Sequence, residues 1–341
     1  MTTIFEQEIV SQAAILRART TSGLSQAQSA AATWTGVTHA VVAARGSSDN
    51  AAIFFQYLAG RELGLLVALA ATSLYESERS IGLGGAGVLI ISQSGRTPGM
   101  TEVLEQARAQ GRPTIVVTND VGSPVANAGD AVIDLAAGPE LAIASSKTFS
   151  TTWHALAQLV EVLKGEPLEG LGELADEVER VSTWALSAAM PTSTLNAPGG
   201  LTVVGRGIGF AVASEIALKV REVTGLRAEA FAAADFLHGP SGADGAGSTL
   251  LLVLTEELTD EIASSVLESG RAMGMATVVL RTSSRESCDC DNEILMEEVT
   301  PNWSLGLAQV IVGQVLALRI GELRHRPIDT SPGLSKVTLT A

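Results

Sequence analysis

The chain has 341 residues, enough for two domains, and a formal net charge of −15 at pH 7. This charge excludes nucleic acid and anionic membranes as expected partners, because both would repel the protein. Hydrophobic residues make up 46% of the sequence and charged residues 17%, a balance typical of a compact protein with much buried surface.

Apolar, strand-like segments alternate with helical segments along the chain. Residues 4–19 have a helical apolar pattern and predict an N-terminal helical arm. Strands are predicted to begin at His39 and Gly200, with further strands over 88–91, 114–118, 250–254 and 277–280, and helices over 49–63, 168–187, 210–224 and 305–323. The uncharged stretch 191–200, PTSTLNAPGG, is interpreted as a linker because Pro and Gly interrupt both patterns.

The second half of the chain repeats the pattern of the first. Aligning Gly46 with Gly207 gives an offset of 161 residues (207 − 46 = 161), and the other strands fall into register at roughly that offset. We therefore predict an α/β fold with two doubly wound parallel-sheet domains in tandem, produced by internal duplication. The predicted ranges are 1–30 for the arm, 31–190 and 200–324 for the two domains, and 325–341 for a C-terminal tail.

The hexapeptide SQSGRT follows a buried strand, at the strand end where open α/β sheets bind ligands. We predict Thr97 as a helix N-cap with Pro98 at the first helical position, so that free amides and the helix dipole attract an anion. Ser92, Ser94 and Thr97 add hydroxyl groups, and Gly95 allows close approach of the backbone. The pattern favours a phosphate-binding loop, with an ordinary Ser-rich turn as the alternative.

The matching place in the second half carries Glu256 and Glu257. Two carboxylates would repel an anion. We therefore expect a single anion site, in the first half.

A second cluster of functional side chains lies between residues 214 and 240. On a helix, Glu215, Lys219 and Glu222 have i, i+4 and i+7 spacing and share one face. One interpretation is a solvated face with a single Glu–Lys pair. The many neighbouring Ala, Val, Ile and Leu residues favour partly buried carboxylates, whose pKa would rise and suit a general base. His238, before Gly-Pro in a loop, is either structural or catalytic.

Two other features carry no function on local sequence alone. Cys288 and Cys290 have no histidine or further cysteine nearby, so they are interpreted as a surface turn and not as a metal site. Lys336, near the end of the chain, is expected to be solvated.

Several sequence blocks, in order and covering nearly the whole chain, resemble the SIS (sugar isomerase) family of phosphosugar-binding proteins. The nearest likeness is to the isomerase part of glucosamine-6-phosphate synthase and to type II glucosamine-6-phosphate deaminases. The blocks are RGSS at 45–48, SQSG at 92–95, GPE at 138–140 with ASSK at 144–147, EIALKVRE at 215–222, AEAF at 228–231 with LHGP at 237–240, and LSK at 334–336.

The resemblance implies two SIS domains, the first binding phosphate and the second carrying a catalytic Glu and His, with no metal or organic cofactor. It implies that the phosphate is bound by Ser92, Gln93, Ser94 and Thr97, and that the substrate also meets Gly46, Ser48 and Ser145. Glu222 would move a proton between C2 and C1 with support from Lys219. His238 would assist ring opening from the partner subunit of a homodimer. Lys336 would contact the sugar near its carbonyl, with the tail over the active site.

Three departures from the family pattern bear on the activity. Met1 opens directly onto the arm with no glutaminase domain before it, so a single-chain glutamine-dependent synthase is not expected. Arg96 stands where the synthase has Glu, and together with Leu237 it favours the deaminase group. Asp235 replaces a Glu of the family pattern, which affects the expected sugar pocket.

These features predict a glucosamine-6-phosphate deaminase, which couples aldose–ketose isomerisation to release of ammonia and yields fructose 6-phosphate. Three alternatives stay open. The same C2 carbanion would serve a dehydratase (lyase) of N-acetylglucosamine 6-phosphate, and a fructosamine-6-phosphate deglycase would use the same scaffold. A phosphosugar-sensing protein is the non-enzymatic alternative. Retention of Glu222, His238 and Lys336 favours catalysis.

The sequence also predicts a cytoplasmic location. The opening residues, MTTIFEQEIV, contain acids and no basic residue, unlike a secretory signal. The longest strongly apolar stretch that we identify, 63–75, is shorter than the roughly 20 residues that span a bilayer. Two cysteines are too few for a disulfide framework and suit a reducing compartment.

Overall fold

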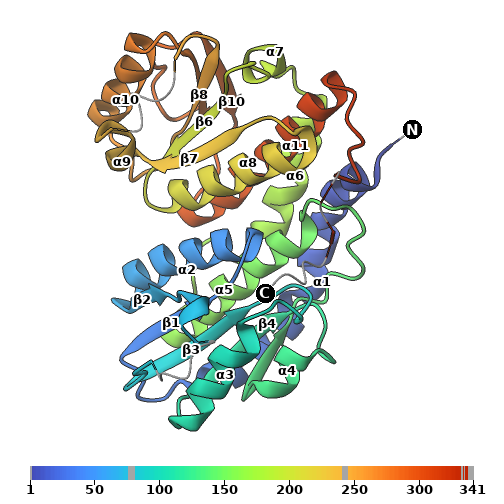
Figure 1. Ribbon diagram of the computed structural model, residues 1–341, viewed down its shortest axis with the longest axis vertical. Coiled ribbons are helices and arrows are strands. Elements are labelled where there is room, and N and C mark those ends of the chain that lie inside the picture. The colour runs from blue at the N-terminus through green and yellow to red at the C-terminus, as the bar shows by residue number, and fades with distance from the viewer. Residues whose placement is uncertain (1, 76–80, 240–244, 332, 334, 337–341) are drawn as a thin grey trace. The chain divides into compact units, whose positions relative to one another are not determined.

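In the computed structural model, the chain divides into two compact α/β units (Figure 1). The structure describes residues 2–75, 81–239, 245–331, 333, 335 and 336. One unit, which we call the β1–β5 unit, consists of residues 12–140, 147–172 and 335–341. The other, the β6–β10 unit, consists of residues 1–11, 141–146 and 173–334.

The β1–β5 unit contains a five-stranded parallel sheet in the order β2-β1-β3-β4-β5. Its elements are most of α1 (Ile4–Thr33), then β1 (His39–Ala43), α2 (Ser47–Leu63), β2 (Leu66–Leu69), η1 (Thr72–Leu74), β3 (Ala86–Ile91), α3 (Met100–Ala109), β4 (Thr114–Thr118), α4 (Pro124–Ala128), β5 (Ala131–Asp134) and α5 (Lys147–Lys164). Strands β3 and β4 are buried along their whole length, as expected for strands covered on both faces. Alternate side chains of β1, β3 and β4 pack against α3, while α2 packs against α5.

The β6–β10 unit has a second five-stranded parallel sheet, in the order β10-β9-β8-β6-β7. Its elements are α6 (Leu174–Ser187), α7 (Thr192–Leu195), β6 (Gly200–Gly205), α8 (Ile208–Thr224), β7 (Ala228–Ala232), α9 (Ala233–Leu237), β8 (Ser248–Val253), α10 (Asp260–Ala272), β9 (Ala276–Thr282), β10 (Asn292–Met296) and α11 (Asn302–Leu323). Helices α9 and α10 pack with one apolar cluster of the sheet, whereas α8 packs against α11 (Figure 1).

The two sheets have the same order of strands when each is numbered along the chain, second-first-third-fourth-fifth. The first helix after the first strand is also alike in both. Gly46 precedes α2 with φ 63° and ψ −133°, and Gly207 precedes α8 with φ 61° and ψ −129°. Both helices end at a left-handed glycine, Gly64 or Gly225.

A matching Thr–Asp pair ties the fourth strand of each sheet to the segment before the fifth. The amide and hydroxyl of Thr114 donate to Asp130, at 2.9 and 2.8 Å, and the Asp130 amide donates back to the hydroxyl. Thr277 and Asp291 form the same three hydrogen bonds, two of them at 2.8 and 3.0 Å. The likeness of the units therefore extends to side-chain detail.

The α/β class, the parallel sheets and the predicted strands are confirmed, and two expectations need correction. The stretch interpreted as a linker contains α7, whose Thr194 carbonyl accepts a hydrogen bond of 2.7 Å from Thr249 of β8. The units also interleave along the chain: residues 173–190, expected with the first domain, belong to the β6–β10 unit.

Helix α11 corrects the expectation that 63–75 is the longest apolar stretch. Among the residues described, α11 is the one helix long and apolar enough to cross a membrane by length and composition. However, 94% of its most apolar 18-residue window is buried inside the structure. Helix α11 packs chiefly on α8 and α6, as a core helix does.

A buried arginine links α1 to α5 and β5 in the β1–β5 unit. The Arg19 guanidinium lies 3.2 Å from Nδ1 of His154 and donates to Gln158 at 3.1 Å and to the Asp134 carbonyl at 3.3 Å. Burial, together with the neighbouring Arg19 charge, lowers the pKa of His154 to about 3. Burial also lowers the pKa of Arg19 to about 10, against the opposing effect of Asp134. The imidazole is therefore neutral and accepts from Arg19.

Replacing His154 is expected to change how stability depends on pH. The folded-state pKa lies below the unfolded value near 6.5, so the unfolded chain binds a proton more readily as pH falls from 6.5 toward 3. The stability that depends on neutral His154 is therefore fully present above pH 6.5. Below pH 6.5 the free energy of unfolding falls by at most about 1.4 kcal/mol per pH unit because of this residue. The variant His154→Asn should lose this part of the slope in urea unfolding between pH 7 and pH 5. The control His39→Asn should keep it; an unchanged slope in His154→Asn would contradict the assignment.

Candidate functional site

The predicted phosphate-binding residues lie where the strand order of the first sheet reverses. Strands β1 and β3 pair directly, with Ala43 opposite Ile90, yet β1 leads on to β2 on one side and β3 leads on to β4 on the other. Ligands of open α/β sheets bind in the crevice outside the carboxyl ends of two such strands. The loop after β1 carries Gly46, and the loop after β3 carries SQSGRT. The structure therefore brings both predicted loops to one edge of the sheet.

The loop after β3 has a conformation that its glycine allows. Gly95 has φ 60°, in the left-handed region, and a Cβ there would collide with the hydroxyl of Ser123. The Gly95 carbonyl accepts from the Val125 amide at 3.3 Å. Ser92 is only 2% exposed, and its hydroxyl lies 2.8 Å from that of Thr97. The loop is thus folded back on itself, with its two ends joined by hydroxyl groups.

Helix α3 begins later than predicted, so the assignment of Thr97 as its N-cap is wrong. The helix starts at Met100 with Gly99 as N-cap, at φ 82° and without a side-chain cap. The Thr97 hydroxyl is engaged with Ser92, and Pro98 lies in a turn before the helix. Gly99, in the left-handed conformation, turns the chain into the helix without a capping hydroxyl.

The loop after β1 leads into the first turn of α2. The Gly46 carbonyl accepts from the amides of Asp49 and Asn50, at 2.9 and 3.2 Å, and Ser48 is half-buried within that turn. Arg45 is exposed and donates to the hydroxyl of Thr72 at 2.8 Å. Burial raises the pKa of Asp49, with Arg45 acting in the opposite direction.

Lys336 is not the solvated side chain that local sequence suggests. Its Nζ lies 2.7 Å from Oε2 of Glu140, and the Glu140 side chain is fully buried whereas that of Lys336 is 22% exposed. The amide and hydroxyl of Thr148, in the first turn of α5, also donate to Glu140 at 3.0 and 2.7 Å. No role is predicted for Glu140 from the sequence. Its only signal was its place in the GPE block.

Glu140 carries opposing influences on its charge. Burial pushes its pKa up, but the Lys336 charge and the hydrogen bonds from Lys336 and Thr148 outweigh burial and leave the pKa below its ordinary value. Glu140 is therefore a carboxylate at neutral pH despite its lack of solvent.

The β6–β10 unit holds the predicted charged trio on α8. Lys219 lies between two carboxylates, 3.4 Å from Glu215 and 2.5 Å from Glu222. Glu215 and Lys219 are 0% and 1% exposed at their side chains, whereas Glu222 retains 21%. The solvated-face interpretation therefore fails for Glu215 and Lys219. Glu222 is the member of the trio that still reaches solvent.

The strand-order reversal of the second sheet lies between β6 and β8 and is lined differently. Carbon atoms of Glu257 lie 2.8 Å from the position that a Cβ at Gly207 would take. A carboxylate side chain thus occupies the place beside the helix-leading glycine. Its charge disfavours an anion there.

The remaining residues singled out from the sequence all lie in the β6–β10 unit: Ser145, His238, Cys288 and Cys290. Ser145 is half-buried in the segment 141–146, which belongs to that unit, and His238 is exposed at the end of α9, with its amide donating to Asp235 at 3.1 Å. Cys288 and Cys290 are half-buried against the apolar cluster of β8 and α10, more than a surface turn implies. Burial raises the pKa of both thiols, that of Cys290 to about 11. Within the described ranges, no group of three metal-ligating side chains forms.

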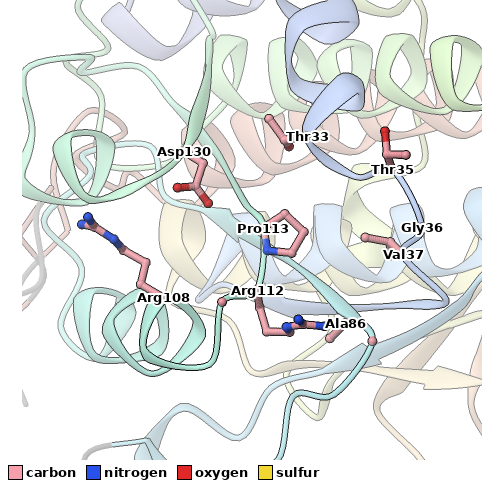
Figure 2. Close-up of a pocket in the computed structure, with 11 residues that line it drawn as sticks. Thr33, Thr35, Gly36, Val37, Ala86, Arg108, Arg112, Pro113 and Asp130 are labelled. Atoms are coloured by element: carbon pink, nitrogen blue, oxygen red, sulfur yellow. The ribbon is translucent and has the colours of Figure 1, made fainter.

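A separate cavity of about 520 Å³ lies at the opposite edge of the first sheet (Figure 2). Thr33, Thr35, Arg108, Arg112 and Asp130 line it, and none of them is a predicted site residue. Arg108 lies in the last turn of α3, where a cation complements the carbonyl end of the helix, and Asp130 is held by Thr114. The charged residues that line the cavity are two arginines and one aspartate.

Residues 36–162 match the family described as "SIS domain". The glutamine–fructose-6-phosphate aminotransferase (isomerizing) of Symbiobacterium thermophilum is 29% identical over 305 residues, which cover 85% of this chain and 50% of the relative. The chain thus spans about half the length of the curated relatives it matches.

Two solved structures share the fold. The C-terminal domain of the glucosamine-fructose-6-phosphate aminotransferase of Francisella tularensis has a TM-score of 0.84 at 20% identity, covering 97% of this chain and 98% of that one. Glucosamine-6-phosphate deaminase of Thermotoga maritima has a TM-score of 0.76 at 18% identity, covering 98% and 99%. The matched domain contains both loops at the strand-order reversal of the first sheet. The chain therefore contains a region, residues 36–162, that matches the SIS domain, and it is similar in sequence to isomerizing glutamine–fructose-6-phosphate aminotransferases.

Proposed function

We propose that the chain is an enzyme acting on hexosamine phosphates and that its reaction is the deamination of glucosamine 6-phosphate to fructose 6-phosphate. The observation that carries this proposal is the SQSGRT loop, folded around Gly95 at the strand-order reversal of a SIS domain. The curated relatives are named as isomerizing aminotransferases that act on fructose 6-phosphate, which supports the substrate class.

In this proposal, the phosphoryl group is bound by the loop after β3. Ser92, Gln93, Ser94 and Thr97 supply its hydroxyl, amide and backbone donors, and Gly46, Ser48 and Ser145 contact the rest of the substrate. Binding energy gained at the phosphate holds the reacting carbons in place, because interactions remote from the chemistry lower the entropy cost of reaction.

Glu222 is proposed as the base. It removes the C2 proton of the open-chain aldose and returns it to C1, while the aldehyde oxygen takes up a proton and the amino group gives one up. The product has an imine at C2, which water hydrolyses to the ketone and ammonia. Lys219, whose Nζ lies 2.5 Å from Glu222, stabilises the negative charge of the Glu222 carboxylate during this transfer. His238 assists ring opening, and Lys336 meets the sugar near its carbonyl oxygen.

Three further expectations belong to the same proposal. The second sheet is a duplicated copy of the first, which the shared strand order, the paired glycines and the Thr–Asp pairs support. His238 acts from the partner subunit of a homodimer, and its exposure in a single chain leaves it accessible for this role. The protein works in the cytoplasm.

A substrate panel tests the reaction. The purified chain is incubated with glucosamine, galactosamine and N-acetylglucosamine 6-phosphates and with fructosamine 6-phosphate. Ammonia and fructose 6-phosphate from glucosamine 6-phosphate are the expected products. A new ultraviolet chromophore from the N-acetylated sugar would show a dehydratase instead. Binding without turnover of any of them would indicate a sensor.

Ser94→Ala is expected to weaken phosphate binding. The variant removes one hydroxyl donor to a charged group, which contributes about 1.5 to 3 kcal/mol, so the inhibition constant of inorganic phosphate should rise about tenfold or more. Ser29→Ala, on the exposed face of α1, is the matched control and should leave the constant unchanged. Equal constants for Ser94→Ala and the wild type would contradict the phosphate site.

Glu222→Gln is expected to abolish most of the turnover. Loss of a general base costs about 10² to 10⁴ in rate, and the amide retains the shape of the side chain. The rate of ammonia release from glucosamine 6-phosphate measures the effect. Glu261→Gln, at an exposed glutamate of α10, should retain the wild-type rate. Ammonia release near the wild-type rate in Glu222→Gln would refute the assignment of the base.

A further inference from the structure

The contact between Glu140 and Lys336 joins residues 196 positions apart in the chain. Lys336 is the last described residue, and its Nζ donates to a carboxylate that solvent does not reach. We propose that Glu140 positions the ammonium group of Lys336, holding this residue on the β1–β5 unit as a charged hydrogen-bond donor. The inference deepens the proposed function, since it rests on the role proposed there for Lys336.

The loop that carries Glu140 is itself clamped to the carboxyl edge of the first sheet. The side chain of Asn119, just after β4, accepts from the Ala137 amide and donates to the Gly138 carbonyl, both at 2.9 Å. The backbone amide of Asn119 in turn donates to the Gln93 carbonyl at 3.0 Å. One asparagine thus ties the loop before Glu140 to the SQSGRT loop.

Backbone conformation in the same loop indicates that its shape is specified. Gly138 has φ 66°, and Ala136 has φ 48°, a left-handed value that is uncommon for a residue with a Cβ. The Ala136 amide donates to Asp134 at 2.8 Å and helps to hold that conformation. Residues in such conformations persist only where the surroundings determine them, and they concentrate at functional sites.

The charge balance explains why the lysine is held firmly. A fully buried carboxylate is costly unless charged or polar donors surround it. Thr148 supplies two donors at the amino end of α5, where the helix dipole also favours a negative charge, and Lys336 supplies the compensating positive charge. Lys336 is thereby tied to Glu140 as an ammonium group. An ammonium group donates to a carbonyl oxygen, whereas only the neutral amine attacks a carbonyl carbon.

Glu140→Gln tests this role, because the amide is isosteric and can still accept from Thr148 but no longer pairs with the ammonium charge. The matched control is Glu62→Gln, which removes the 2.9 Å ion pair between Glu62 and Lys164. This pair lies in the same unit but does not involve Glu140 or Lys336. The full-length proteins are acylated with an N-hydroxysuccinimide ester, and the rate at each lysine is read by peptide mass spectrometry. Only the neutral amine reacts.

In Glu140→Gln, Lys336 should be acylated about tenfold faster than in the wild type, with Lys164 unchanged, because the lysine is no longer held against a carboxylate. In Glu62→Gln, Lys164 should speed up and Lys336 should not. An unchanged Lys336 rate in Glu140→Gln overturns the inference. This readout needs no substrate, so its outcome does not depend on whether the proposed reaction is correct.

Turnover separates positioning from mere stability. With glucosamine 6-phosphate, kcat of Glu140→Gln should fall at least tenfold with KM within about twofold, while Glu62→Gln behaves as the wild type. Unchanged kcat in Glu140→Gln, beside loss of turnover in Lys336→Met, would overturn the positioning role. Absence of ammonia from the wild type, together with the acylation result above, would instead refute the proposed function and leave the Glu140–Lys336 pairing established.

A second variant keeps the inference testable should Glu140→Gln fail to fold. Lys336→Met removes the compensating charge from the partly exposed side of the pair. The deficit in its melting temperature relative to the wild type should be greatest at pH 7 and shrink toward pH 4.5, because protonation relieves the unpaired Glu140 carboxylate. A deficit independent of pH, or none at all, overturns the pairing.

Discussion

The direct parallel pairing of β1 with β3 is the constraint on which the candidate site depends. The strand that follows β1 lies on one side of this pair, and the strand that follows β3 lies on the other. The pairing thus brings the loop at Gly46 beside the loop at Ser92–Thr97. The conformation of the second loop depends in addition on Gly95, because Ser123 at the start of α4 leaves no room for a Cβ there. The phosphate-binding role proposed for this edge is thus a consequence of strand order and one glycine conformation.

Each unit also pairs a lysine with a fully buried glutamate. In the β6–β10 unit, Lys219 lies between Glu215 and Glu222, and in the β1–β5 unit Lys336 pairs with Glu140. Buried ion pairs seldom add much stability, because desolvation offsets the attraction between the charges. Their presence in a core rich in Ala, Val and Leu is consistent with the proposed chemistry, which uses a fixed carboxylate and a fixed ammonium group. In both units one member keeps partial contact with solvent, Glu222 at 21% exposure and Lys336 at 22%.

Sequence pattern was sufficient for the elements and for the loops, but not for contacts between distant residues. Strands such as 88–91 and 114–118 were predictable because continuous apolar runs between helices admit few other structures. The start of α3 was missed because Thr97 and Pro98 satisfy the usual N-terminal preferences, whereas the left-handed conformation of Gly99 shows only in the backbone. Glu140 was missed because its importance comes from burial and from a partner 196 residues away, neither of which leaves a local pattern.

The most direct test of the account is a crystal structure of the chain with glucosamine 6-phosphate. The account predicts that the phosphoryl oxygens accept hydrogen bonds from Ser92, Ser94 and Thr97, beside the amino end of α2. A phosphoryl group bound in any other place, including the cavity lined by Arg108 and Arg112, would contradict it.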